Sequence, residues 1–171
     1  IKAANLFIAL MCWRNTRRYF KAIGQAPNHI DPRSYSEKMQ CRKLFDRNPF
    51  LQLCCDKLAS RAHFEQENYG IKFPEIYWTG DDVDRTPFDI LPLPYIIKPN
   101  GRSGVHIAVK DRDAIDKSEI RAVCHRWLKS PYGRANGEWG YLAAPRKIII
   151  EELLPSETDV PFPDASKFIV I

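Results

Sequence analysis

Several features that mark specialised proteins are missing from this sequence of 171 residues. Lys and Arg outnumber Asp and Glu by 26 to 21, but the charges of both signs are interspersed and form no long basic run. A nucleic-acid-binding patch is therefore not indicated, whereas the net charge of +5 still favours small anions such as nucleotides. No internal repeat or low-complexity segment is present. The composition, with 44% hydrophobic and 27% charged residues, predicts a globular chain.

The five cysteines form neither a CxxC pair nor a Cys/His spacing of the kind that binds zinc. Their odd number also argues against a disulfide framework that uses all of them. Reduced thiols in a cytoplasmic protein explain this pattern best, so we expect neither disulfides nor a zinc site. The cysteines are Cys12, Cys41, Cys54, Cys55 and Cys124.

The chain also lacks a long apolar run. Residues 1–13 are mostly apolar, but the run stops at Arg14, Arg17 and Arg18 and is too short to span a bilayer as a helix. No small-residue cleavage site of a signal peptide follows it. We interpret the segment as an amphipathic helix with a basic end. A weak contact of residues 1–20 with the inner face of a membrane is a further hypothesis.

Apolar periodicity and breaker residues predict three helices in the first half of the chain. The first helix is predicted over 1–24. The second should begin at Ser34 or Ser36, because serines that can cap a helix precede the apolar positions there. After a break at 46–49, a third helix is predicted over 50–68.

The second half has the pattern of an antiparallel sheet with one helix packed on it. We therefore expect an α+β fold, with a mainly helical region at 1–92 and a lobe built on the sheet at 93–171. The last residues, KFIVI, have the pattern of a strand, so we expect a piece of a longer protein with an incomplete C-terminal lobe. Apolar surface near Ile148 and Ile150 should then be exposed. The predicted strands are 71–80, 95–98, 105–110 and 147–152, and the predicted helix is 111–130.

A lysine and a glycine-containing loop lie together between two of these strands. Lys98 ends one strand, NGRSG follows at 100–104, and the next strand returns. Glycines let backbone N–H groups approach a phosphate closely, and a lysine supplies a point charge for the same group. An ordinary hairpin with a surface lysine has the same pattern. The segment is not a Walker loop, because no helix opening with GK[ST] follows it.

Two further pairs of charged residues lie on either side of this loop in the sequence. Asp56-Lys57 falls within a predicted helix, and Glu151-Glu152 follows three isoleucines. The two glutamates have a simple explanation, which is that the strand reaches the surface and acids solvate its end. The alternative is a hinge whose backbone and Glu151 carboxylate bind an adenine edge.

The order of these features resembles the ATP-grasp superfamily, to which D-alanine–D-alanine ligases belong. The shared order is a helical D-K, a strand lysine before a glycine loop, and a buried strand ending in E-x-x-L. More narrowly, the chain resembles the TupA-like ATP-grasp family, which is associated with teichuronopeptide and capsular polysaccharide synthesis. This resemblance runs from about Pro32 to the end of the chain. It is carried by PRSYSEKMQCRKLFDRNP, CCDKLASR, YIIKPNGRSG, GEWGY and PRKIIIEELL.

The resemblance implies that 93–171 is a nucleotide-binding lobe, and it gives particular residues roles in binding the phosphates of ATP. Lys57 and Lys98 would contact the α- and β-phosphates, and a mobile loop would close over the β- and γ-phosphates. Val105 stands where related sequences often carry a second glycine, which puts the closure of this loop in question. The implied loop residues are Gly101, Arg102, Ser103 and Gly104.

The resemblance implies an adenine and ribose site as well. Glu151 and Glu152, with the backbone around Leu153 and Leu154, would hold adenine. The ribose hydroxyls would be bound by Asp164, with Glu157 as its rival, because a proline-rich insertion blurs the alignment there.

The implied reaction is the joining of a carboxylate to an amine. The carboxylate attacks the γ-phosphate, and an amine captures the resulting acylphosphate while Mg²⁺ bridges the phosphate oxygens. We expect the metal ligands beyond residue 171. The implied partners are ATP, Mg²⁺, and carboxylate and amine substrates of a glycan or peptide-glycan pathway. Two alternatives stay open: a kinase-like phosphoryl transfer to a sugar or glycan, and a degenerate module that binds nucleotide without catalysis.

Overall fold

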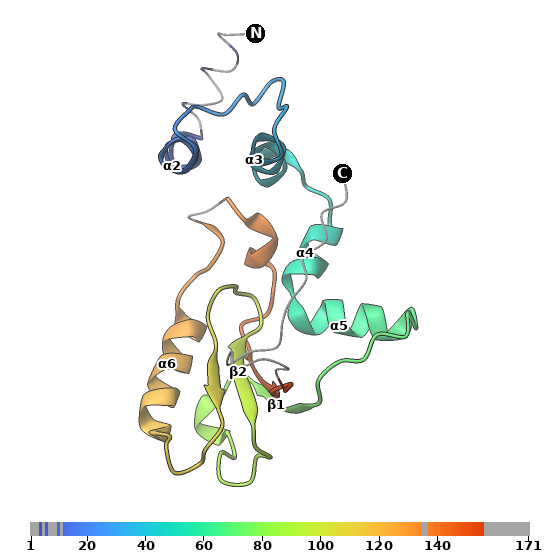
Figure 1. The fold of residues 1–171 in the computed structure, drawn as a ribbon, viewed down its shortest axis with the longest axis vertical. Coiled ribbons are helices and arrows are strands. Elements are labelled where there is room, and N and C mark those ends of the chain that lie inside the picture. The colour runs from blue at the N-terminus through green and yellow to red at the C-terminus, as the bar shows by residue number, and fades with distance from the viewer. Residues whose placement is uncertain (1–3, 5, 7–9, 11, 135–136, 156–171) are drawn as a thin grey trace. The chain divides into compact units, whose positions relative to one another are not determined.

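The computed structural model describes residues 4, 6, 10, 12–134 and 137–155. Its helices and antiparallel sheet confirm the predicted α+β class (Figure 1). The chain forms two compact units. The first comprises Ile1–Ser60 and Pro131–Ala144, and the second comprises Arg61–Ser130 and Pro145–Ile171. Each unit is described by itself below.

The first unit is mainly helical, as predicted for the front of the chain. Gly24 ends α2 in the left-handed conformation with a φ of 82°, as expected for a glycine C-cap. Most of the predicted helix before α2 lies outside the described residues. The elements are α2 (Trp13–Ile23), α3 (Tyr35–Phe45), α4 (Phe50–Cys55), the start of α5 (Lys57–Gln66) and the short 3-10 helix η3 (Trp139–Leu142).

A capping box begins α3 and confirms the prediction of its start. The Ser34 hydroxyl accepts the Glu37 N–H, and the Glu37 carboxylate accepts the Ser34 N–H at 3.0 Å. The same carboxylate also accepts the backbone N–H groups of Asn28, at 2.9 Å, and Arg33, at 3.0 Å. These hydrogen bonds lower the pKa of Glu37 to about 2. One side chain thus ties the preceding loop to the helix.

The single helix predicted over 50–68 is wrong, because the chain breaks at Asp56. This residue has extended backbone, with φ −99° and ψ 106°, between α4 and α5. Its carboxylate accepts the Ala59 N–H at 2.9 Å, so Asp56 acts as the N-cap of α5. Lys57 is therefore the first residue of α5 rather than a residue in the middle of a helix.

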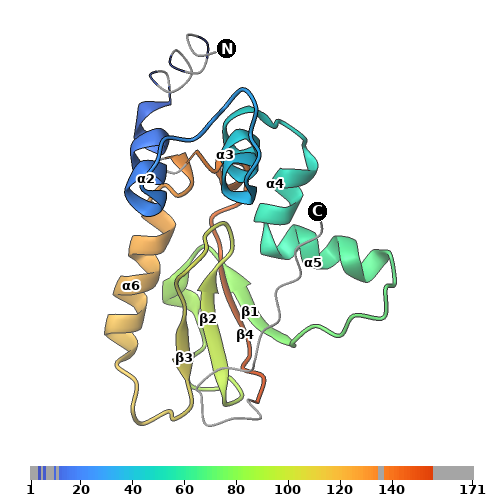
Figure 2. The ribbon, with the colours of Figure 1, turned by 45° about the horizontal axis from the view of Figure 1, so that its top comes forward.

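The second unit contains a four-stranded sheet in the order β1-β4-β2-β3, with all neighbours antiparallel (Figure 2). The last strand of the described residues, β4, lies between β1 and β2. Since β1 precedes residue 92, the sheet takes strands from both predicted regions, and the division at that residue stays a prediction. The strands are β1 (Ile76–Gly80), β2 (Tyr95–Pro99), β3 (Ile107–Val109) and β4 (Ile148–Glu152).

One helix, α6 (Lys117–Lys129), packs on a single face of this sheet. Its residues Ile120 and Cys124 join the core formed with the strands and with the 3-10 helix η1 (Val83–Arg85). The helix was predicted from residue 111 but begins later, because Asp116 caps it by accepting the N–H groups of Ser118 and Glu119. Burial raises the pKa of the Cys124 thiol to about 11.

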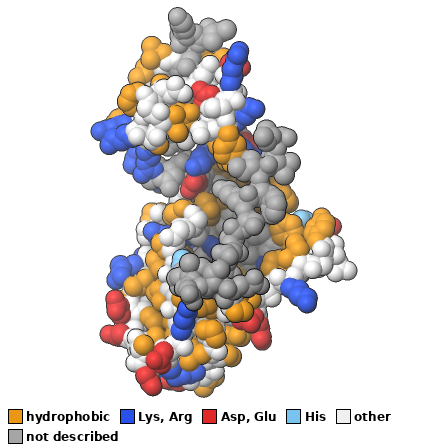
Figure 3. Space-filling model, viewed as in Figure 1, with side chains coloured by type: hydrophobic (Ala, Val, Ile, Leu, Met, Phe, Trp, Pro, Cys, Tyr) orange, Lys and Arg blue, Asp and Glu red, His pale blue; other side chains and the backbone are white. Residues whose placement is uncertain are grey.

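The expectation of exposed apolar surface at Ile148 and Ile150 is wrong. Their side chains are 1% and 0% exposed, and both belong to the core cluster. The reason is the strand order, because β4 pairs on both edges and its core face is covered by α6 and the 83–91 segment. On the surface seen in Figure 3, acidic and basic side chains are interspersed among hydrophobic ones.

We predict that Glu37→Gln lowers the stability of the first unit by about 1 kcal/mol at pH 7, the usual cost of losing a capping interaction. Since the folded pKa, about 2, lies below the ordinary value of 4.5, the carboxylate stabilises the fold above pH 4.5. The difference between the two proteins should shrink as the pH falls from 4.5 toward 2. Urea unfolding followed by circular dichroism at several pH values measures it. An equal loss for Glu67→Gln, at an exposed position after α5, would contradict the role given to Glu37.

Candidate functional site

The two faces of β2 differ in what they carry. Tyr95 and Ile97 are buried and belong to the core, whereas Ile96 and Lys98 between them are only partly buried. Alternate residues of a strand point to opposite faces of a sheet. Lys98 therefore lies on the face opposite to the core cluster.

An ion pair on this second face joins the two central strands. In the register of β2 with β4, Ile96 lies opposite Glu151 and Lys98 lies opposite Ile149, so Lys98 and Glu151 are diagonal neighbours. The Lys98 ammonium donates to the Glu151 carboxylate. The two side chains are only 25% and 10% exposed. The sheet thus holds one cation and one anion in fixed positions on a largely covered surface.

The loop after β2 is anchored at its base and open at its tip. Asn100 is fully buried; its backbone N–H donates to the Lys147 carbonyl at 2.8 Å, and its side-chain amide donates to the Pro145 carbonyl at 3.1 Å. Ser103 and Gly104 are exposed. Gly104 has a φ of +76°, and apart from its two chain neighbours no atom of the described residues lies within 4 Å of the place where a Cβ would stand. The tip therefore combines a conformation that favours glycine with space for another group to approach.

At the end of β4, two backbone N–H groups already donate hydrogen bonds within the protein. The Leu153 N–H donates to the Pro94 carbonyl at 3.2 Å, and the Glu152 N–H donates to the Glu75 carbonyl at 2.8 Å. Leu153 is buried, whereas Leu154 is exposed. The N–H groups of Glu152 and Leu153 are therefore already used within the protein, and the adenine role of Leu154 stays a prediction.

The structure brings together only some of the predicted site residues. Lys98, the loop at 101–104 and the segment 151–154 belong to the same unit, whereas Lys57 belongs to the first unit and is described only there. The ribose ligand predicted at Asp164 and its rival Glu157 lie outside the described residues.

Two general findings bear on cofactors and location. Within 12–134 and 137–155, no group of three or more His, Cys, Asp and Glu side chains is arranged to hold a metal ion, and the cysteines are free thiols. None of the helices formed by the described residues is long and apolar enough to cross a membrane.

The ion pair itself was not visible in the sequence. Lys98 and Glu151 are 53 positions apart, and only the pairing of β2 with β4 makes them neighbours. The anchor at Asn100 was missed as well. The asparagine directly after a strand and before a glycine is a signal that could have suggested it, because asparagine side chains commonly hydrogen-bond backbone groups in turns.

Comparisons of the chain with protein-family models, with curated proteins and with solved structures return no match.

We predict that Lys98→Met costs about 1–3 kcal/mol of stability, because it leaves the Glu151 carboxylate largely buried without its counter-charge. The double variant Lys98→Met/Glu151→Gln should recover much of that loss. The unmodified chain, the single variants Lys98→Met and Glu151→Gln, and the double variant form a double-mutant cycle. Chemical denaturation measures the free energy of unfolding of each. The exposed pair of Arg33 and Asp31, with 3.0 Å between Nε and Oδ2, is the control, and its coupling should stay below about 0.5 kcal/mol. Additive effects at Lys98 and Glu151 would contradict a stabilising pair.

Proposed function

We propose that the chain binds ATP on the sheet face that carries Lys98 and Glu151. The observation that supports this most is the placement of a partly covered lysine on β2, directly before the Asn100-anchored glycine loop. A fixed ammonium group and the backbone N–H groups of an open loop are suited to a polyphosphate. Glu151, on the neighbouring strand, would face the base.

The ion pair gives this site a defined response to a nucleotide. Lys98 has three N–H donors, and Glu151 accepts from one of them. A phosphate can use the remaining donors, or it can compete with Glu151 for the ammonium group. Either arrangement depends on the lysine's positive charge, so removal of that charge should weaken binding without altering the loop.

For the full reaction, we propose the ATP-dependent joining of a carboxylate to an amine, as the TupA-like resemblance implies. The reaction would take place in the cytoplasm, as a step in the synthesis of a surface polysaccharide. The carboxylate oxygen would attack the γ-phosphorus and ADP would leave; the amine would then attack the acyl carbon and release phosphate. Mg²⁺ would neutralise the phosphate charge. Kinase-like transfer to a sugar is the alternative, and it differs in that phosphate stays on the acceptor.

We predict that Lys98→Ala weakens ADP binding by roughly tenfold or more, since a charge-assisted contact to phosphate is lost. Titration calorimetry with and without Mg²⁺ measures the affinity. Lys110→Ala is the matched control, because Lys110 is an exposed lysine just after β3, on the same hairpin. It should bind ADP as the unmodified chain does.

Two outcomes would count against this site. Equal affinity of the Lys98→Ala and unmodified chains would remove the phosphate role of Lys98. Equal losses in the Lys98→Ala and Lys110→Ala chains would indicate a general effect of positive charge rather than a defined contact. Circular dichroism on each variant verifies that the fold is retained.

A second surface is suited to the hypothesis of membrane contact. The helix α2 has no acidic residue, and its side chains Trp13 and Phe20 are 55% and 53% exposed. Arg17 lies between them in the sequence, with its guanidinium 5.6 Å from the centre of the Trp13 ring. Exposed aromatic rings interleaved with cations are typical of helices that lie on anionic bilayers. We propose that α2 contacts the headgroups of an anionic membrane surface.

We predict that the chain co-sediments with phosphatidylglycerol vesicles and much less with phosphatidylcholine vesicles, and that added salt weakens the binding. Trp13→Ala/Phe20→Ala should lower the bound fraction. The control is Tyr69→Ala/Ile71→Ala, which removes two comparably exposed apolar side chains, 62% and 52% exposed, from the second unit. Binding that is equal for both lipids, or equally reduced in both double variants, would contradict the assignment to α2.

A further inference from the structure

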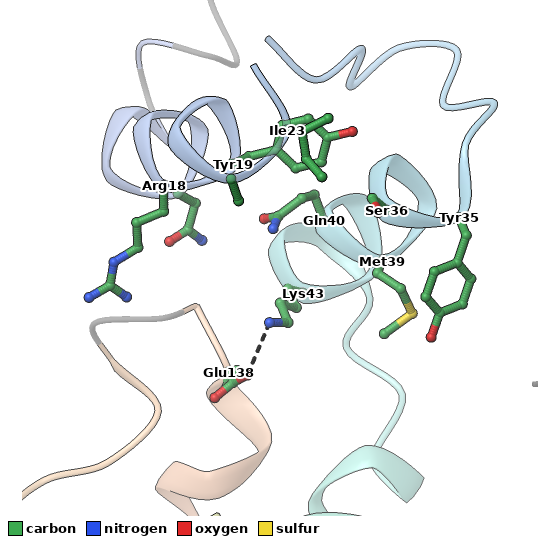
Figure 4. A pocket seen from close by; sticks show the side chains of 11 residues that line it. Arg18, Tyr19, Ile23, Tyr35, Ser36, Met39, Gln40, Lys43 and Glu138 are labelled. Atoms are coloured by element: carbon green, nitrogen blue, oxygen red, sulfur yellow. Dashed lines mark ion pairs between the residues drawn. The ribbon is translucent and has the colours of Figure 1, made fainter. Parts of the chain in front are cut away.

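The first unit contains a pocket of about 370 Å³ between α2, α3 and Glu138 (Figure 4). Its wall is polar on the side of Lys43, Gln40 and Glu138, and Ile23 and Met39 supply apolar surface. The size falls within the range of small-molecule sites. The pocket lies within the first unit, whereas the proposed nucleotide site lies within the second.

The loop before η3 places Glu138 in this wall. Gly137 has a φ of +70°, and a Cβ there would lie 2.4 Å from the side-chain nitrogen of Asn15, so the loop runs directly against α2. From this position, one oxygen of Glu138 pairs with the Lys43 ammonium on α3 at 3.0 Å, as Figure 4 shows. The carboxylate is thereby fixed between the two helices.

Two polar atoms of residues that line the pocket are buried without a hydrogen-bond partner among the described residues. One is the hydroxyl of Tyr19, a residue only 4% exposed, whose ring extends from α2 toward α3 in Figure 4. The other is Oε2 of Glu138, the carboxylate oxygen that Lys43 does not use. Buried polar groups are normally satisfied, and each such exception calls for a partner. Both atoms belong to residues that line the same pocket.

The charges around the pocket define what that partner should be. Arg18 and Lys43 contribute two positive charges to the lining, against one negative charge from Glu138. A ligand with an anionic group is therefore favoured. The remaining oxygen of Glu138 accepts only, so the ligand must also carry an O–H or N–H donor.

We propose that this pocket binds a small carboxylate that carries a hydroxyl or an amino group beside the carboxyl group. The ligand carboxylate lies near the Lys43 ammonium group, and its hydroxyl or ammonium donor meets Glu138 Oε2. The Tyr19 hydroxyl pairs with a ligand oxygen. Carbon atoms of the ligand pack on Ile23 and Met39. This assignment does not rest on ATP binding.

Four small molecules that share a six-carbon skeleton test this chemistry. Each is titrated into the protein, and binding is monitored by the NMR signals of the protein. Norleucine and 2-hydroxyhexanoate carry the carboxylate with an amino or a hydroxyl donor; hexanoate lacks the donor, and 1,2-hexanediol lacks the charge. At least one of the first two should bind about tenfold more tightly than hexanoate and the diol. Which of the two binds more tightly distinguishes an amino acid from a hydroxy acid. If neither binds at about 20 mM, or if hexanoate binds as well as they do, the proposal is overturned.

Two variants test the named atoms. Tyr19→Phe should weaken binding of the better probe about fivefold and leave the thermal unfolding temperature unchanged or raised, because the hydroxyl it removes has no protein partner. Glu138→Gln should remove most of the preference over hexanoate. Tyr69→Phe and Glu65→Gln are the matched controls; Tyr69 is exposed, and Glu65 is ion-paired with Arg61 in the second unit. Unchanged affinity in the Tyr19 and Glu138 variants would overturn the proposal.

Failure here and failure of the ATP proposal can be told apart. ADP titration reports on Lys98 in the second unit, whereas the six-carbon probes report on Tyr19 and Glu138 in the first. If the unmodified chain binds ADP but none of the probes, only the carboxylate proposal fails; if it binds a probe but not ADP, only the ATP proposal fails.

Discussion

The second unit depends on β4 being the middle strand of its sheet. Ile148 and Ile150 supply its core face, Ile149 is buried on the other, and both edges are hydrogen-bonded. Burial of three isoleucines contributes on the order of 5–9 kcal/mol before the loss of chain entropy is counted. In the sequence, β4 follows residues 131–144, which belong to the first unit. The chain therefore leaves the second unit after α6 and returns to it to add the middle strand of the sheet. Glu151 is brought to Lys98 only by that return.

The same pairing explains why a charged pair can lie on a sheet in this position. A single charge with so little exposure would be costly, and Lys98 and Glu151 limit that cost by neutralising each other. Each side chain projects from a regular strand with its neighbours fixed, so little entropy is lost when the pair forms. A ligand phosphate at Lys98 would therefore meet an ammonium group that is already in place. A charged group that is fixed before the ligand arrives lowers the entropy cost of binding a polyphosphate.

Local patterns predicted the local structure well, and long-range pairing was beyond them. The Ser34 cap, the three-isoleucine strand and the strand ending at the glycine loop were all visible because each is defined by neighbouring residues. The break at Asp56 and the late start of α6 at Asp116 were missed because helical periodicity continues through both positions. A capping carboxylate outweighed that pattern in each case. The exposure expected at Ile148 failed for another reason, since strand order is not written in any single segment. For the site, residue types could be named, but not their neighbours, and the roles implied by the family resemblance stay predictions.

The two ion pairs at the proposed sites differ in what they leave for a ligand. At Lys98 and Glu151 no atom is buried without a partner, so an incoming anion must share or displace an existing interaction. At Lys43 and Glu138 one carboxylate oxygen is left over, and a ligand donor can be added while the pair stays intact. The first arrangement favours a strongly charged ligand, because only such a ligand can compete with a carboxylate for the lysine. The second favours an anionic ligand with a well-placed donor, because satisfying a buried acceptor adds to the attraction of the positively charged lining. A polyphosphate suits the first and a substituted carboxylate the second, so the chemistry of the two pairs favours different ligands for the two proposed sites.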